Sequence, residues 1–183
     1  MAGSYRFLTQ VYYCGSPLDN VLKYHMLYAL NEEATRTLIT EPTEHILPKD
    51  TVCRIAEQCG GHPFLTQYLM HHLWESGLEC AHPEQVQMLA RRFGRQRPDF
   101  RAWTNGLGDS GIRIYGILDQ AEQALSEDQI WAALRPAPRD FSQALEALCY
   151  HGIVARAPDG DRYRIAGKMH REWFRQNQGT HRR

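Results

Sequence analysis

The feature that most constrains the fold of this chain is the run Gly60-Gly61-His62-Pro63, which separates two segments of helical pattern. Upstream of it, four apolar residues follow the i, i+3, i+4, i+7 spacing of one helical face: Val52, Ile55, Ala56 and Cys59. Gly60-Gly61 is typical of a left-handed helix cap, because glycine adopts positive φ without steric cost. Pro63 suits the first turn of the next helix, where a missing N–H loses no helical partner. The sequence therefore predicts two helices joined by a tight turn.

Helical periodicity extends on both sides of this turn, over residues 31–97. Asn31 is a suitable N-cap, and the charges of Glu32 and Glu33 favour the positive end of a helix. The expected helices cover about 31–41, 50–59, 63–76 and 83–93. We expect this region to be a small all-helical module.

A different order of elements is predicted for residues 110–177. Ser126-Glu127-Asp128-Gln129 is a capping box, and helices are expected before it, directly behind it and over Phe141–Leu148. Residues 153–156 and 162–165 are predicted to form a hairpin, with a last helix over 169–177. Three helices followed by a hairpin make a winged helix, a relative of the helix-turn-helix. The predicted fold class is therefore mainly α, with a small helical module followed by a winged-helix domain.

Charge and cysteine usage argue against several classes of function. The chain has 21 Lys and Arg against 21 Asp and Glu, whereas a dedicated nucleic-acid binder is usually clearly basic. Five cysteines without a Cys-x-x-Cys pair are typical of a reducing compartment. His71-His72 has no second pair of ligands in the sequence, so no metal site is expected. The longest apolar run is only a few residues, so we expect no membrane segment and a cytoplasmic protein.

Motifs that carry catalytic chemistry are missing from the sequence. It contains no GxxxxGK[ST] phosphate-binding loop, no GxGxxG opening a helix after a strand, no HExxH and no GxSxG. Carboxylates are scattered without a paired arrangement. We therefore expect no catalytic residues and no enzyme activity from this chain alone.

Two stretches resemble a known family: LNEEATRTLITEP over residues 30–42 and VCRIAEQCGGHPFLTQ over residues 52–67. They are similar to the helical lid of STAND-type and archaeal-type AAA-like ATPases, in which a winged helix commonly follows the lid. The resemblance implies that Gly61, His62 and Pro63 would lie over a bound nucleotide and report its state. It also implies that Tyr5 to Leu8 corresponds to the strand that precedes the lid.

The chain departs from that family in the nucleotide-binding core. Without a phosphate-binding loop there is no cradle of backbone amides for phosphates, and without a Walker B strand there is no magnesium site. We therefore expect no cofactor on this chain, and ATP or ADP only where a nucleotide-binding core is also present. Either the chain is a fragment of a longer ATPase, or the core was lost.

The expected organisation has five parts. Residues 1–30 are an N-terminal strand and the segment leading into the helices, with Tyr5–Tyr13 as the strand. Residues 31–97 form the lid-like module, 98–109 a linker, 110–177 the winged-helix domain and 178–183 a tail. Because a strand without a partner needs a sheet edge, Tyr5–Tyr13 is expected to pair with a second copy or to fold back on the hairpin.

Two functions are open from the sequence. The first is a non-catalytic regulatory and protein-interaction region of a STAND/AAA-like signalling ATPase, whose partner is another protein or the missing ATPase core. The alternative is a winged-helix DNA-binding transcriptional regulator. Its candidate nucleic-acid contacts are Arg139, Gln143, Arg156, Arg162 and Arg164. Asp140 and Glu146 on the same helix would repel phosphates, so only weak DNA binding is expected.

Overall fold

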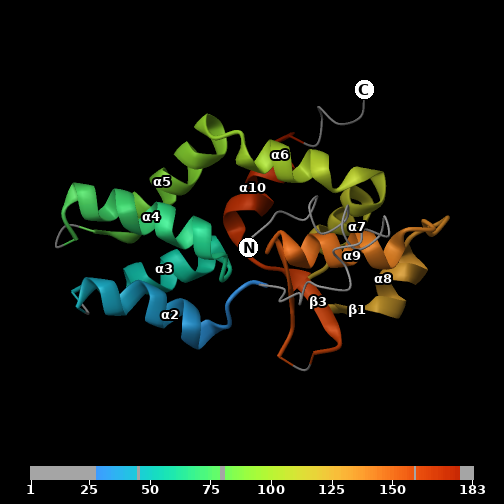
Figure 1. The fold of residues 1–183 in the computed structure, drawn as a ribbon, viewed down its shortest axis with the longest axis horizontal. Coiled ribbons are helices and arrows are strands. Elements are labelled where there is room, and N and C mark those ends of the chain that lie inside the picture. The colour runs from blue at the N-terminus through green and yellow to red at the C-terminus, as the bar shows by residue number, and fades with distance from the viewer. Residues whose placement is uncertain (1–27, 45, 79–80, 159, 178–183) are drawn as a thin grey trace, which may run out of the picture.

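The structure, a computed structural model, describes residues 28–44, 46–78, 81–158 and 160–177. Within these ranges the protein is mainly helical, with a small three-stranded antiparallel sheet (Figure 1). The strand expected over Tyr5–Tyr13 and the tail 178–183 lie outside the described residues. No helix of the described part is both long and apolar enough to cross a membrane.

The helices predicted around the Gly60-Gly61 turn are confirmed. They are α2 (Glu32–Thr40), the short 3₁₀ helix η2 (Glu41–Thr43), α3 (Lys49–Cys59), α4 (Pro63–Ser76) and α5 (Pro83–Gln96). Asn31 caps α2 as expected, its Oδ1 accepting a hydrogen bond of 2.8 Å from the N–H of Ala34. Gly60 ends α3 in the left-handed conformation, with φ of +59°, and α4 begins at Pro63. The cap residues therefore act as the pattern predicts.

Residues 98–109 differ from the linker expected there. Most of them form α6 (Asp99–Gly106), and Gly108 already begins α7 (Gly108–Gln120). Phe100 and Thr104 on α6 are fully buried, so this segment belongs to the core. The nearby arginines and the Asn-Gly pair suggested a solvated connection. These residues outweighed the short apolar pattern of Phe100 and Trp103, so no helix was predicted here.

The second half of the chain contains the predicted three helices and hairpin, together with one strand that the pattern does not reveal. The elements after α7 are β1 (Leu125–Ser126), α8 (Glu127–Ala133), α9 (Phe141–Tyr150), β2 (Val154–Arg156), β3 (Arg162–Ile165) and α10 (Lys168–Asn177). The capping box is present: the N–H of Gln129 donates to Ser126 Oγ, and Gln129 Oε1 accepts from the N–H of Ser126. β1 is only two residues long, too short to show an alternating pattern.

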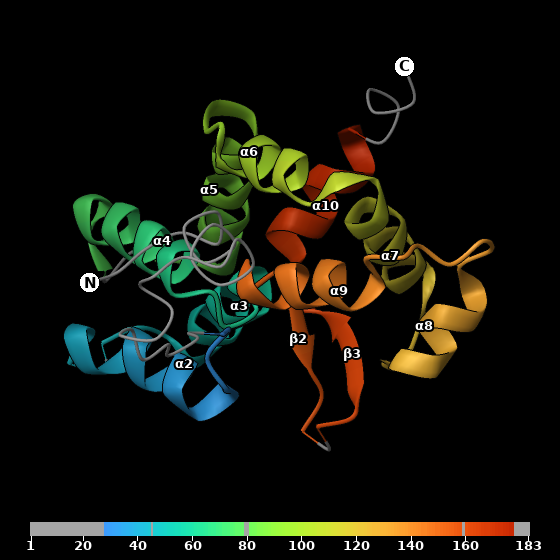
Figure 2. The same ribbon diagram turned by 45° about the vertical axis from the view of Figure 1, so that its right-hand side comes forward.

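The sheet has the strand order β1–β3–β2, and both neighbouring pairs are antiparallel. β3 is thus the central strand, and β2 is an edge strand whose open side faces α2 (Figure 2). Within the described residues, β2 therefore pairs with a strand on one side only.

The two halves of the chain share one hydrophobic core. A single cluster of buried residues runs from Ile39 in α2 to Phe174 in α10. α10 lies between the halves and packs against α3 and α5. It is tied to α7 by Asp119, which is 7% exposed and accepts hydrogen bonds from Arg171 Nε at 2.6 Å and Arg175 Nε at 2.9 Å. The last helix therefore fixes the second half against the first.

Candidate functional site

The turn after α3 is held between two other pieces of backbone. Both glycines have positive φ, and a Cβ at Gly60 would overlap the carbonyl carbon of Ala166, while one at Gly61 would overlap the carbonyl oxygen of Leu30. The N–H of Leu30 donates to the carbonyl oxygen of Gly61 at 2.8 Å. A Cβ at Gly167 would in turn lie 2.6 Å from the carbonyl carbon of Cys59. Glycine is therefore required here by close packing as well as by φ.

The resemblance implies a nucleotide-facing role for Gly61, His62 and Pro63. In the described structure Gly61 is buried against Leu30, His62 is half-buried and Pro63 is exposed at the start of α4. The described contacts of Gly61 and His62 are with backbone and rings of this chain. Their nucleotide role stays a prediction.

Behind the turn, three histidines surround Trp103 of α6. The ring of His62 stacks on Trp103 with centroids 4.9 Å apart. His151, at the end of α9, and His170, on α10, lie 6.5 and 6.4 Å from the same indole. A Cβ at Gly152 would lie 2.9 Å from the His62 ring, so that glycine leaves room for the imidazole. This cluster joins the turn to both α9 and α10.

Burial keeps these imidazoles neutral. Desolvation lowers the pKa of His62 to about 4 and that of His170 to about 3, and it also lowers the pKa of His151. His170 is hydrogen-bonded on both sides, with Nδ1 2.9 Å from the Tyr115 hydroxyl and Nε2 3.3 Å from the Thr104 hydroxyl. Because His170 is fully enclosed, it acts as a core residue and not as a proton donor to a ligand.

A groove of about 870 Å³ opens beside the turn. One wall consists of residues 28–31, α2 and α3, and the other of β2, the end of β3 and the start of α10. The walls meet where the Gly60-Gly61 turn touches Ala166 and Gly167. The volume lies within the range of about 300–1,000 Å³ that is typical of ligand pockets.

The outer edge of β2 faces this groove, where Arg156 is exposed and Val154 is buried. The N–H of Ala157 donates to Arg162 and the N–H of Ala166 donates to Ile153, which sets the alternation of the ladder. By that alternation Ala155 bonds to β3, while the N–H and C=O groups of Val154 and Arg156 point the other way. Both residues line the groove. Over the described part of the chain, no second strand pairs with this edge.

The groove carries an excess of positive charge. Its acidic side chains are Glu32 and Glu57, and its cationic ones are Arg36, Arg156, Arg164, Lys168 and Arg171. Three of these cations are engaged: Arg36 with Glu32, Lys168 with Glu57, and Arg171 with Asp119. Arg156 lies over the Tyr163 ring, 5.6 Å from its centroid, and neither it nor Arg164 has an ion pair within the described ranges. The uncompensated charge is therefore on the hairpin side.

The five residues proposed for nucleic-acid contact are all exposed. Arg156, Arg162 and Arg164 all lie on the hairpin, Arg162 and Arg164 on one face of the sheet and Arg156 on the other. Arg139 precedes α9, and Gln143 lies on its first turn. Asp140 and Glu146 are exposed on the same helix or its cap. The sequence pattern identifies these arginines but not the groove, because its walls come from segments about ninety or more residues apart.

Comparison with known proteins adds no constraint. No protein-family model, no curated protein and no solved structure matches this chain. The groove, the open edge of β2 and the histidine cluster are therefore the features from which a function can be inferred.

The close approach at the turn predicts a difference between two glycines of similar conformation. Gly60→Ala should lower the free energy of unfolding by about 3 kcal/mol or more, since the left-handed conformation and an overlap with Ala166 both oppose it. Gly108→Ala, at φ of +64° with nothing within 4 Å, should cost only about 1 kcal/mol. Urea denaturation followed by circular dichroism measures both. Equal losses would contradict the packing argument.

The histidine cluster predicts loss of stability on acidification. The folded-state pKa values of about 3 for His170 and about 4 for His62 lie below the usual value of about 6.5, so the unfolded state binds more protons. The contribution of these histidines to stability should be complete above about pH 7 and fall as the pH drops towards about 4 for His62 and about 3 for His170, by up to roughly 1.4 kcal/mol per pH unit for each histidine.

Urea denaturation at several pH values tests this. His170→Gln should be less stable at neutral pH, because a packed core residue is changed, yet its stability should depend less on pH. His82→Gln, at an exposed position, is the matched control and should keep the full dependence. An unchanged slope in His170→Gln would show that His170 is not among the groups responsible.

Proposed function

We propose that this chain is a non-catalytic regulatory and protein-interaction region, and that the groove beside β2 holds an extended segment of a partner protein. The observation that carries this proposal is the open edge of β2 within a groove that also contains Arg156 and Arg164. An extended partner segment is recognised mainly through its backbone hydrogen bonds. Such a site needs no catalytic side chains.

Strand addition is the recognition mode that fits such an edge. An extended peptide placed alongside the end of β2 would exchange hydrogen bonds with the outward-facing groups of Arg156, the exposed residue of this edge. Its side chains would alternate between the two faces of the extended sheet. Because the charge of the groove is positive on the hairpin side, the partner segment is acidic.

The resemblance to STAND and AAA-like ATPases supplies a framework for regulation. In this framework α2 to α5 form the lid, and residues 110–177 form a winged helix. The order of three helices and a hairpin, with β1 added to the hairpin, supports the second assignment. Since one groove wall belongs to the lid and the other to the hairpin, a bound segment would hold the two together.

DNA binding is a second candidate, and the exposed hairpin arginines favour it. Arg156, Arg162 and Arg164 would contact phosphates as a wing does. The helix that would enter the major groove, α9, has Asp140 at its cap and Glu146 exposed, and both oppose the phosphate backbone. Weak, nonspecific binding is the expected result.

A peptide-binding experiment tests the leading proposal. A short fluorescein-labelled peptide of alternating Glu and Thr should raise its anisotropy on binding, and a Lys-Thr peptide of the same length should bind at least about tenfold more weakly. Methylating alternate backbone nitrogens of the acidic peptide should also weaken binding, because strand addition uses its N–H groups.

Matched variants separate the groove from the rest of the surface. Combining Arg156→Glu with Arg164→Glu should lower the affinity for the acidic peptide by about tenfold or more. Arg139→Glu, outside the groove, should leave its affinity unchanged. If the N-methylated peptide binds as well as its parent, strand addition is wrong; if Arg139→Glu is as harmful as the double variant, the groove assignment is wrong.

Titration with random-sequence duplex DNA at two salt concentrations tests the second candidate. We expect affinities of about 10⁻⁴ to 10⁻⁶ M at physiological salt, falling steeply as salt rises. Arg139→Glu should weaken this binding, in contrast to its lack of effect on the peptide. Binding better than about 10⁻⁸ M to particular sequences would instead favour a transcriptional regulator.

A further inference from the structure

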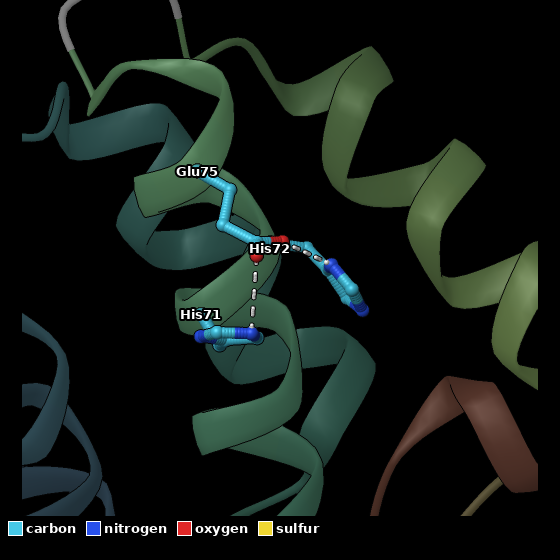
Figure 3. A group of neighbouring side chains, drawn as sticks. All are labelled: His71, His72 and Glu75. Atoms are coloured by element: carbon cyan, nitrogen blue, oxygen red, sulfur yellow. Dashed lines mark hydrogen bonds and ion pairs between the residues drawn. The ribbon is translucent and has the colours of Figure 1, made fainter.

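Three potential metal ligands converge on the exposed side of α4, away from the groove. They are His71, His72 and Glu75, and one ligand atom of each lies within 4.8 Å of the others. Glu75 Oε1 is 3.4 Å from His71 Nε2, and Glu75 Oε2 is 3.0 Å from His72 Nδ1. Figure 3 shows each imidazole pointing to the same carboxylate. No metal site was expected here from the sequence, because the adjacent histidines were considered without Glu75.

Helix geometry explains why the three side chains meet. At about 100° per residue, position 75 lies about 40° from position 71 and about 60° from position 72, one turn further along. The carboxylate is therefore placed between the two rings. His72 is also held by an edge contact with Tyr68, whose ring centroid is 4.5 Å away. Part of the arrangement is thus fixed before any ligand binds.

We propose that His71, His72 and Glu75 form a three-ligand site for a transition-metal cation of the zinc type. Donor atoms bound to one tetrahedral zinc at about 2.0–2.2 Å are roughly 3.4 Å apart. The two His–Glu separations, 3.0 and 3.4 Å, are close to that spacing. Two imidazoles and one carboxylate are a ligand set used by zinc sites with an open coordination position.

The donor types indicate which cations bind. Imidazole nitrogen suits zinc, nickel and copper, whereas magnesium and calcium prefer oxygen ligands alone. His71 and Glu75 are more than half exposed, so water or a donor atom from another molecule completes the coordination. Simple surface pairing of histidine with glutamate, the competing explanation, stabilises a helix only slightly and needs no metal.

Isothermal titration of the full chain, prepared without a polyhistidine tag, with ZnCl₂ near pH 7.4 tests the proposal. We expect one zinc per chain in this site with a micromolar dissociation constant, and a higher melting temperature with zinc, since a ligand that binds the folded state stabilises it. Magnesium chloride at the same concentration should produce neither effect. Cobalt(II) should bind in competition with zinc and give an absorption spectrum of a nitrogen- and oxygen-ligated site.

Variants make the result specific to this site. His71→Ala combined with His72→Ala should abolish the zinc-dependent rise in melting temperature. Glu75→Gln should lower the affinity for zinc by about tenfold or more. His82→Ala and Cys53→Ser change an exposed histidine and an exposed thiol elsewhere, and both should behave as the unmodified chain. Zinc binding that survives the double histidine variant, or that is lost in Cys53→Ser, overturns the proposal.

Discussion

The close approach of backbone to backbone at Gly60 and Gly61 is the constraint on which the rest of the structure depends. A Cβ atom at Gly60 would overlap the backbone of Ala166, and a Cβ atom at Gly61 would overlap the backbone of Leu30. The turn belongs to the first helical module, and Ala166 connects the hairpin to α10. The turn that joins α3 to α4 therefore also fixes the position of the hairpin relative to the helices.

The groove follows from that contact. Because the two halves touch at the glycine turn, α2 and β2 diverge from it and leave a space between them. α10 maintains the arrangement from behind, since Asp119 holds it to α7 while its other face packs on α3 and α5. The histidines around Trp103 pack behind the turn, and burial there lowers their pKa values, so they are neutral at pH 7.

Local features of this structure were predictable from the sequence, and features assembled across the chain were not. The Asn31 cap, the Ser126 capping box and the Gly60 helix end each depend on a few adjacent residues, and all are confirmed. Residues 98–109 were misjudged because their arginines and turn residues outweighed a short apolar face. The hairpin arginines were identified, but the groove needs α2 and β2 side by side, and no local pattern contains that information. Glu75 was also missed, although it lies only three and four residues from the histidines, because the adjacent pair His71-His72 was considered without the i+3 and i+4 position of the same helix.

The charge of the hairpin has two effects that reinforce each other. An open strand edge tends to pair with other copies of the same chain, and proteins commonly prevent this with short strands and cationic side chains. β2 is three residues long and is accompanied by Arg156 and Arg164, so two copies meeting at this edge would bring like charges together. The same charges attract an acidic segment. With 21 cationic and 21 acidic residues in the whole chain, this selectivity depends on where charges are placed and not on their total.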